Sequence, residues 1–183
     1  MSQQTFLLAG FGGQGLLFAG KVIACAGMLS GKEISWIASY GPEMRGGTAN
    51  CSVILSDEPI GSPLVLSPSV LVALNLPSFD KFEKSVAKGG IAIIDSSMIE
   101  RNPVRDDINY CKIPVTRVAN ENDLKGLSNM VVLGVLLKLT NFVEYNIMLE
   151  ALKKSVPAKK EALIDSNIKA IELGFNYDCS FIK

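Results

Sequence analysis

Two glycine-rich segments near the N-terminus contain the groups of this chain best suited to bind a phosphate. Residues 10–15 read Gly-Phe-Gly-Gly-Gln-Gly and directly follow an apolar stretch, residues 5–9. Glycines spaced like these permit a tight turn and let backbone N–H groups approach a phosphate. A helix that begins after such a turn adds about half a positive charge at its N-terminus. The first segment therefore predicts a strand-to-helix turn that can bind an anion.

The second segment, residues 39–48, adds a cation to this chemistry. It reads Ser-Tyr-Gly-Pro-Glu-Met-Arg-Gly-Gly-Thr, so that Arg45 is followed by Gly46 and Gly47. A guanidinium binds phosphate or carboxylate through two parallel hydrogen bonds. The segment therefore favours an anion site, with the alternative that Arg45 pairs with Glu43 or caps a turn.

A dinucleotide site is a weaker interpretation of the first segment. Such sites also use an acidic residue near the end of the second strand, where it binds the ribose. Here residues 37–40 read Ile-Ala-Ser-Tyr, while Glu33 lies at the start of that strand and Glu43 lies beyond it. The segment is not a P-loop either, because no Gly-Lys-Ser/Thr follows. A stand-alone nucleotide-binding dehydrogenase and a turn without any ligand remain as alternatives.

Strands alternate with helices through the first two thirds of the chain, and helices follow to the C-terminus. Apolar and β-branched runs predict strands over residues 5–10, 33–38, 48–56, 70–75, 91–95 and 110–115. Helices are predicted over residues 14–29, 77–87, 128–140, 143–156 and 158–173. Gly31 is expected to end the first helix in a left-handed conformation, and Ser128 or Asn129 to cap the third.

This alternation predicts an α/β fold, a Rossmann-like three-layer domain with a mostly parallel sheet and C-terminal helices. The chain has no low-complexity stretch or linker, so residues 1–183 are expected to form one domain. Asp95 ends a predicted strand, where α/β sites gather, but it is expected mainly to cap the segment that follows.

The composition excludes several classes of function. The chain has no histidine, which excludes Ser-His-Asp and Cys-His catalysis within it. Lysine plus arginine equals aspartate plus glutamate, at 18 each, which argues against a general nucleic-acid binder. No apolar run approaches the roughly 20 residues that span a membrane. Residues 1–4 lack a basic region, so no secretory signal is expected and the predicted location is cytoplasmic.

Scattered cysteines and clustered lysines both have simple interpretations. No Cys-x-x-Cys pair is present, which argues against an iron–sulfur cluster or a structural zinc in this chain. The cysteines are therefore expected to be small, unreactive thiols. They are Cys25, Cys51, Cys111 and Cys179. The lysines near the C-terminus are interpreted as a solvated face, which comprises Lys153, Lys154, Lys159 and Lys160.

The two glycine-rich segments together resemble the gamma subunit of 2-oxoacid:ferredoxin or flavodoxin oxidoreductases. Residues 10–15 and 40–49 carry the resemblance, and residues 56–63, 89–95 and 128–131 extend it over nearly the whole chain. In this family the complete enzyme oxidatively decarboxylates a 2-oxoacid to an acyl-CoA. Thiamine diphosphate carries the carbanion chemistry, and iron–sulfur clusters pass electrons to ferredoxin or flavodoxin.

The resemblance implies that this chain acts only with partners. Alpha and beta subunits build the thiamine site, and the clusters belong to beta or to a small delta subunit. The gamma subunit packs on alpha and is associated with coenzyme A, so no catalytic residue and no metal ligand are expected here. A purely structural subunit is the alternative, and isolated chains could pair through the apolar face meant for alpha. The surface implied for coenzyme A or for alpha comprises Gly12, Gly13, Gln14, Gly15, Arg45, Gly46, Gly47, Thr48 and Asn50.

Overall fold

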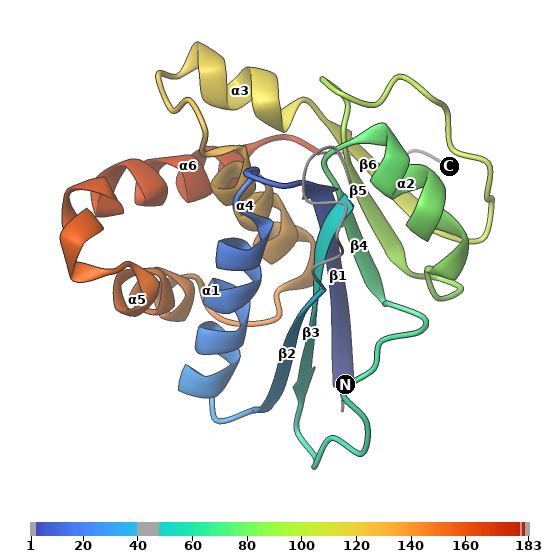
Figure 1. The fold of residues 1–183 in the computed structure, drawn as a ribbon, viewed down its shortest axis with the longest axis horizontal. Coiled ribbons are helices and arrows are strands. Elements are labelled where there is room, and N and C mark those ends of the chain that lie inside the picture. The colour runs from blue at the N-terminus through green and yellow to red at the C-terminus, as the bar shows by residue number, and fades with distance from the viewer. Residues whose placement is uncertain (1–2, 40–47, 180, 182–183) are drawn as a thin grey trace.

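A computed structural model describes residues 3–39, 48–179 and 181, and its centre is a six-stranded sheet. The strand order is β2-β3-β1-β4-β5-β6. Strands β1, β4, β5 and β6 pair in parallel, whereas β3 pairs antiparallel with both β1 and β2 (Figure 1). The predicted α/β fold with a mostly parallel sheet is confirmed. The strands are β1 (Gln3–Phe11), β2 (Glu33–Ser39), β3 (Thr48–Ser56), β4 (Val70–Ala73), β5 (Ile91–Asp95) and β6 (Asn109–Ile113).

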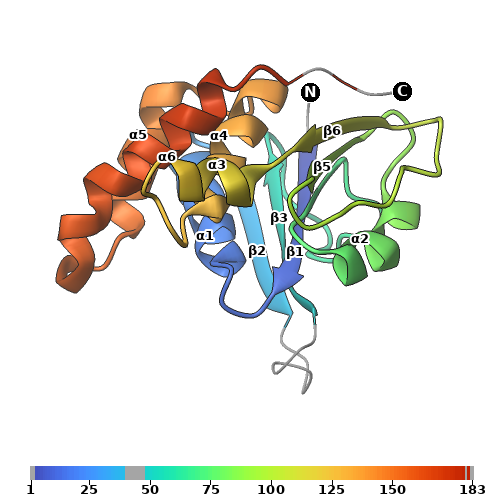
Figure 2. The ribbon, with the colours of Figure 1, turned by 90° about the horizontal axis from the view of Figure 1, so that it is seen from above.

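Helices cover the two faces of the sheet unequally. Helices α1, α4, α5 and α6 lie on one side, whereas α2 lies on the other (Figures 1 and 2). Two short 3-10 helices, Glu83–Ser85 and Ala158–Leu163, follow α2 and precede α6. The α-helices are α1 (Leu16–Leu29), α2 (Leu76–Phe82), α3 (Val115–Glu121), α4 (Ser128–Thr140), α5 (Tyr145–Ser155) and α6 (Ile164–Asn176).

Alternating side chains of the strands build a separate core on each face. In β1, Phe6 and Leu8 pack into the large core under α1 and α4, whereas Leu7 belongs to the small core that includes Phe79 of α2. This alternation is the period of two expected of a strand. Strand β4 is apolar and buried on both faces, which explains why it reads as a continuous apolar run.

Several predicted boundaries differ from the structure, among them the end of the helix predicted over residues 77–87, because α2 ends at Phe82. Strand β6 ends at Ile113 because Pro114 cannot donate a ladder hydrogen bond, and the unpredicted helix α3 begins directly after it. The predicted cap of α4 is wrong, since Leu127 precedes the helix and no side chain caps it. The helix predicted over residues 158–173 starts with a 3-10 segment and continues to Asn176. Gly31 has φ +72°, as predicted.

Helices α4 and α6 pack with their backbones in contact. A Cβ atom on Gly134 would overlap the carbonyl oxygen of Ile171, and one on Gly174 would overlap the carbonyl oxygen of Val131. Only glycine permits this approach from both sides. The crossing fixes the position of α6 against α4, and therefore the arrangement of the outer helical layer.

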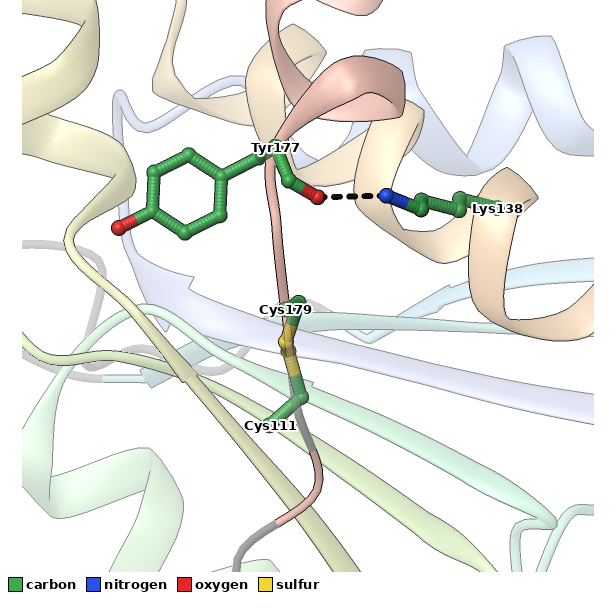
Figure 3. Close-up of a disulfide and its surroundings, with 4 residues drawn as sticks. All are labelled: Cys111, Lys138, Tyr177 and Cys179. Carbon is green, nitrogen blue, oxygen red and sulfur yellow. Dashed lines mark hydrogen bonds between the residues drawn. A yellow bond between two sulfur atoms is a disulfide. The ribbon is translucent and has the colours of Figure 1, made fainter.

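A disulfide between Cys111 of β6 and Cys179 ties the C-terminal segment to the edge strand of the sheet (Figure 3). The two Cα atoms are 6.3 Å apart, and Lys138 Nζ donates a hydrogen bond to the Tyr177 carbonyl oxygen at 2.8 Å. The expectation that all four cysteines are free thiols is therefore wrong for this pair. The two cysteines are 68 positions apart, and no local sequence motif indicates that they would meet.

The two remaining cysteines are free thiols, as predicted. Burial raises the pKa of Cys51 to about 12, against weaker opposite effects of hydrogen bonds with Trp36 and the Gly20 backbone. Because the thiolate is the reactive form, Cys51 is an inert core residue at neutral pH.

The Cys179→Ser variant is expected to unfold at a lower temperature than the oxidised wild-type chain. Closing a loop of 68 residues removes unfolded-state entropy worth at most about 4 kcal/mol, or roughly 10 °C in Tm. Thermal unfolding with and without dithiothreitol checks this expectation. Reductant should lower the Tm of wild type and of the Cys25→Ser control but leave Cys179→Ser unchanged, and an insensitive wild-type chain would contradict the stabilising role.

Candidate functional site

The register of the sheet brings the two glycine-rich segments to one edge. Phe11 at the end of β1 pairs with Thr48 at the start of β3, and Ser39 at the end of β2 pairs with Asn50. Residues 10–15 and both ends of the second segment therefore meet at the carboxyl end of β1. The predicted site residues Arg45, Gly46 and Gly47 lie outside the described residues, as does the side chain of Thr48.

The first segment is a turn built from glycines with positive φ. Gly13 has φ +94° and Gly15 has φ +71°. Gly12 and Gly13 are exposed, and a Cβ atom placed on Gly13 would meet nothing within 4 Å. The turn thus presents bare backbone to the outside, directly before the N-terminus of the 14-residue helix α1. This is the geometry that suits the binding of an anion.

Gln14 fastens the turn to the sheet rather than pointing a free amide outward. Its Oε1 accepts a hydrogen bond from the Phe11 N–H at 2.6 Å, and its Nε2 donates to the Leu74 carbonyl at 3.3 Å. A Cβ atom on Gly10 would overlap Oε1 and displace it, so the absence of a side chain at Gly10 makes room for these two hydrogen bonds of Gln14. In this arrangement the turn offers its backbone, and Gln14 holds that backbone in place.

Gly15 is held from the other side by the C-terminal half of the chain. The Asn129 Nδ2 of α4 donates to the Gly15 carbonyl oxygen at 3.0 Å, across 114 residues of sequence. A Cβ atom on Gly15 would lie 2.5 Å from that Nδ2. Sequence reasoning assigned Asn129 a local capping role and missed this long-range contact, for which neighbouring residues give no signal.

Asn50 is half-buried on the face of the sheet opposite to α1. Its neighbour Cys51 points into the core under α1, so Asn50 faces the α2 side. There it lines a groove of about 400 Å³ together with Ser39, Ser52 and the exposed Leu64. The groove opens near the same edge of the sheet as the two segments.

Asp95 caps the segment that follows β5, as expected from its position at the end of a predicted strand. It is 1% exposed, and its Oδ1 accepts a hydrogen bond from the Ser97 N–H at 2.9 Å while its Oδ2 accepts one from the Thr116 hydroxyl. The carboxylate therefore closes the turn after β5 and joins it to α3.

The sheet order is also unfavourable to the dinucleotide interpretation. In a dinucleotide fold the second strand lies beside the first, so that its terminal carboxylate reaches the ribose. Here β3 separates β1 from β2, and Glu33 lies at the far end of β2. Within residues 3–39, 48–179 and 181, no group of three His, Cys, Asp or Glu side chains could hold a metal, and no helix is long and apolar enough to cross a membrane.

The family model for pyruvate ferredoxin/flavodoxin oxidoreductase matches residues 5–177. The chain belongs to this family. Its place within the family is that of a gamma subunit of the 2-oxoacid:ferredoxin oxidoreductases, as the two glycine-rich segments predicted.

Similar sequences occur both in relatives of about the same length and within a longer relative. The 2-oxoglutarate synthase subunit KorC of Methanocaldococcus jannaschii is 37% identical over 92% of this chain and 90% of its own length. The ketoisovalerate oxidoreductase subunit VorA of Methanothermobacter thermautotrophicus is 41% identical over 91% of this chain. The match spans only 35% of that second relative, so the same unit also occurs within a longer chain.

Solved structures share the fold. The gamma subunit of keto/oxoacid ferredoxin oxidoreductase from Geobacter sulfurreducens superposes with a TM-score of 0.81 at 30% identity, covering 94% of this chain and 96% of that one. The 2-oxoglutarate:ferredoxin oxidoreductase of Magnetococcus marinus, solved with 2-oxoglutarate, coenzyme A and succinyl-CoA, gives a TM-score of 0.85 at 24% identity. The latter match covers 98% of this chain and 32% of the other.

Replacing Gln14 with alanine is expected to destabilise the chain by about 1–3 kcal/mol, because two hydrogen bonds to backbone groups are lost at once. Urea unfolding of Gln14→Ala, with the exposed Gln3→Ala as the matched control, measures the difference. Equal midpoints for the two variants would show that the clamp does not hold the turn.

Proposed function

We propose that this chain supplies part of the coenzyme A site of an assembled 2-oxoacid oxidoreductase and packs on its alpha subunit. The complete enzyme would convert a 2-oxoacid and coenzyme A to an acyl-CoA. Thiamine diphosphate and iron–sulfur clusters would reside in the alpha, beta and possibly delta subunits, with ferredoxin or flavodoxin as the acceptor and the cytoplasm as the location. In this division of labour the cofactors do the chemistry and this chain positions a substrate.

The meeting of both glycine-rich segments at one edge of the sheet carries the proposal. Coenzyme A bears a diphosphate and a 3′-phosphate, so it needs several N–H donors and cations in one place. The exposed backbone of Gly12 and Gly13, in front of the N-terminus of α1, offers the donors. Arg45 belongs to the second segment, whose two flanks, Ser39 and Thr48, are fixed at the same edge. Asn50 would add an amide beside them.

A clamped turn suits this function better than a flexible one. Gln14 and Asn129 hold the two ends of the turn through hydrogen bonds to Phe11, Leu74 and Gly15. A ligand that binds such a preformed backbone loses less free energy to ordering the protein.

Packing on a partner is supported by the apolar side of the groove that holds Asn50. Leu64 and Leu66 are 69% and 83% exposed at its rim, and Ile37 is 38% exposed in it. Apolar side chains gathered this way are typical of protein contacts. A subunit with only a structural role is the alternative, in which both segments would contact alpha and neither would touch coenzyme A.

The Gly13→Ala variant of the assembled enzyme is expected to have a KM for coenzyme A about tenfold higher than wild type. This change corresponds to the loss of one charge-assisted hydrogen bond. The matched control is Gly31→Ala. Gly31 also has positive φ, +72° against +94°, and also has nothing within 4 Å of a Cβ position, so the backbone strain is comparable. Steady-state kinetics and Tm of both variants separate binding from stability, and an unchanged KM in Gly13→Ala would leave only the structural role.

Removing the Arg45 guanidinium is expected to raise the same KM by about tenfold or more, because a hydrogen bond between charged groups contributes roughly 1.5–3 kcal/mol. Arg117→Ala is the control, since Arg117 lies on α3 with a side chain that is 66% exposed. A purely structural segment predicts the opposite pattern for Arg45→Ala. The subunits would then assemble less tightly in analytical ultracentrifugation while the KM for coenzyme A stayed constant.

A further inference from the structure

Beyond α6 the chain crosses the edge of the sheet as a strap, whose described residues are Asp178, Cys179 and Phe181. These residues belong to no helix or strand. Figure 3 shows the strap passing over the strands, with the sulfur of Cys179 bonded to that of Cys111 in β6. Asp178 and Phe181 are exposed, whereas Cys111 is fully buried. The strap therefore covers Cys111, and the disulfide fastens it there.

The elements on either side of the disulfide are held in place by other contacts. Strand β6 pairs with β5 along its full length. Helix α6 lies against α4 through the close backbone contacts of Gly134 and Gly174. The bond therefore acts on the strap rather than on the sheet or the helical layer. Breaking it is expected to release the residues after Tyr177 without unfolding the domain, as in other local openings of native proteins.

The noncovalent contacts at the strap are of a kind that opens by local fluctuation. Lys138 Nζ donates a hydrogen bond to the Tyr177 carbonyl oxygen at 2.8 Å, in an exposed position. Such a bond contributes about 1 kcal/mol net. Tyr177 and Cys179 are only partly buried against the large core. A covalent bond excludes this opening, so the redox state of two sulfur atoms decides whether the strap can leave the sheet.

Thiol–disulfide exchange can open the bond from the solvent side. Cys179 is half-buried and Cys111 is fully buried, so a small thiolate reaches the sulfur of Cys179 first. The thiolate forms a mixed disulfide with Cys179 as the original S–S bond breaks, and Cys111 leaves as a thiolate that takes up a proton. A second thiol then attacks the mixed disulfide and yields the Cys179 thiol and a small-molecule disulfide. The two thiols supply the two electrons, and the small-molecule disulfide reverses both steps.

We propose that the Cys111–Cys179 bond is a reversible redox tether, which fastens the strap over β6 under oxidising conditions and releases it in a reducing thiol pool. Disulfides of cytoplasmic proteins are usually transient and redox-sensing rather than permanent. The tether goes beyond the coenzyme A role and rests only on the proposed cytoplasmic location. Oxidation thereby changes the surface that the chain presents at the edge of the sheet.

Equilibration of the oxidised full chain with glutathione tests whether the bond is reversible. In about 10 mM glutathione, at about 100 reduced to 1 oxidised, most of the bond is expected to open, and it should re-form when the ratio is inverted. Mass spectrometry after acid quenching and alkylation counts two thiols in the oxidised chain and four in the reduced one. A bond that stays closed in reduced glutathione, or that does not re-form, is a permanent structural bond and overturns the proposal.

Cys51 is the internal control for release of the strap, because Cys51 and Cys111 are both fully buried. In reduced wild type and in Cys179→Ser, iodoacetamide is expected to modify Cys111 about tenfold or more faster than Cys51 in the native chain, since only Cys111 is uncovered by local release. A protected Cys51 shows that the domain remains folded. Equal rates at the two positions mean that the strap stays in place or that the whole chain unfolds, and either outcome contradicts the tether.

Limited proteolysis follows the strap itself. Chymotryptic cleavage after Tyr177 is expected to become about tenfold faster on reduction of wild type and of the Cys25→Ser control, and to be fast in Cys179→Ser under both conditions. Equal cleavage of oxidised and reduced wild type overturns the proposal. These measurements involve no coenzyme A, so a negative result leaves the proposed function standing. In the same way, an unchanged KM in Gly13→Ala would leave the tether standing.

Discussion

The antiparallel pairing of β3 with β1 determines where every candidate site residue lies. The ladder runs from Gln3 opposite Ser56 to Phe11 opposite Thr48, over the full length of both strands. Because β3 runs against β1, its first residue meets the last residue of β1, and the two glycine-rich segments share one edge. A parallel third strand would have placed the second segment at the opposite edge, more than 20 Å away at about 3.3 Å per residue.

The position of β3 between β1 and β2 also explains why α1 contains small residues where it faces the sheet. The chain crosses from β1 to β2 over β3, so α1 lies directly on β3 rather than in a groove between neighbouring parallel strands. A Cβ atom on Gly20 would lie 2.6 Å from the Cys51 sulfur, and one on Gly27 would overlap a methyl group of Leu55. The small residues of α1 are therefore required by the strand order, and the same order moves the end of β2 away from the position where a dinucleotide ribose would need it.

Local patterns in the sequence predicted the elements that depend on local physics. Continuous apolar runs identified the buried strands, and Gly31 identified the end of α1. Strand direction is not encoded in such runs, so the reversal of β3 could not be predicted from them. The helix after Pro114 is short and depends on packing, and the Cys111–Cys179 bond joins residues 68 apart. The turn at residues 10–15 was predicted, but its two clamps were not, since they bond residues 60 and 114 positions away.

Asn129 makes the glycine turn and the helical layer parts of one system. Its Nδ2 donates a hydrogen bond to the Gly15 carbonyl oxygen at 3.0 Å, although the two residues are 114 positions apart. Helix α4, which carries Asn129, is in turn held against α6 by the contacts of Gly134 and Gly174. A shift of α4 relative to the sheet would therefore weaken the support of the Gly15 carbonyl, and with it the turn. The fold thus links the glycine turn to the C-terminal helices through one buried amide, that of Asn129.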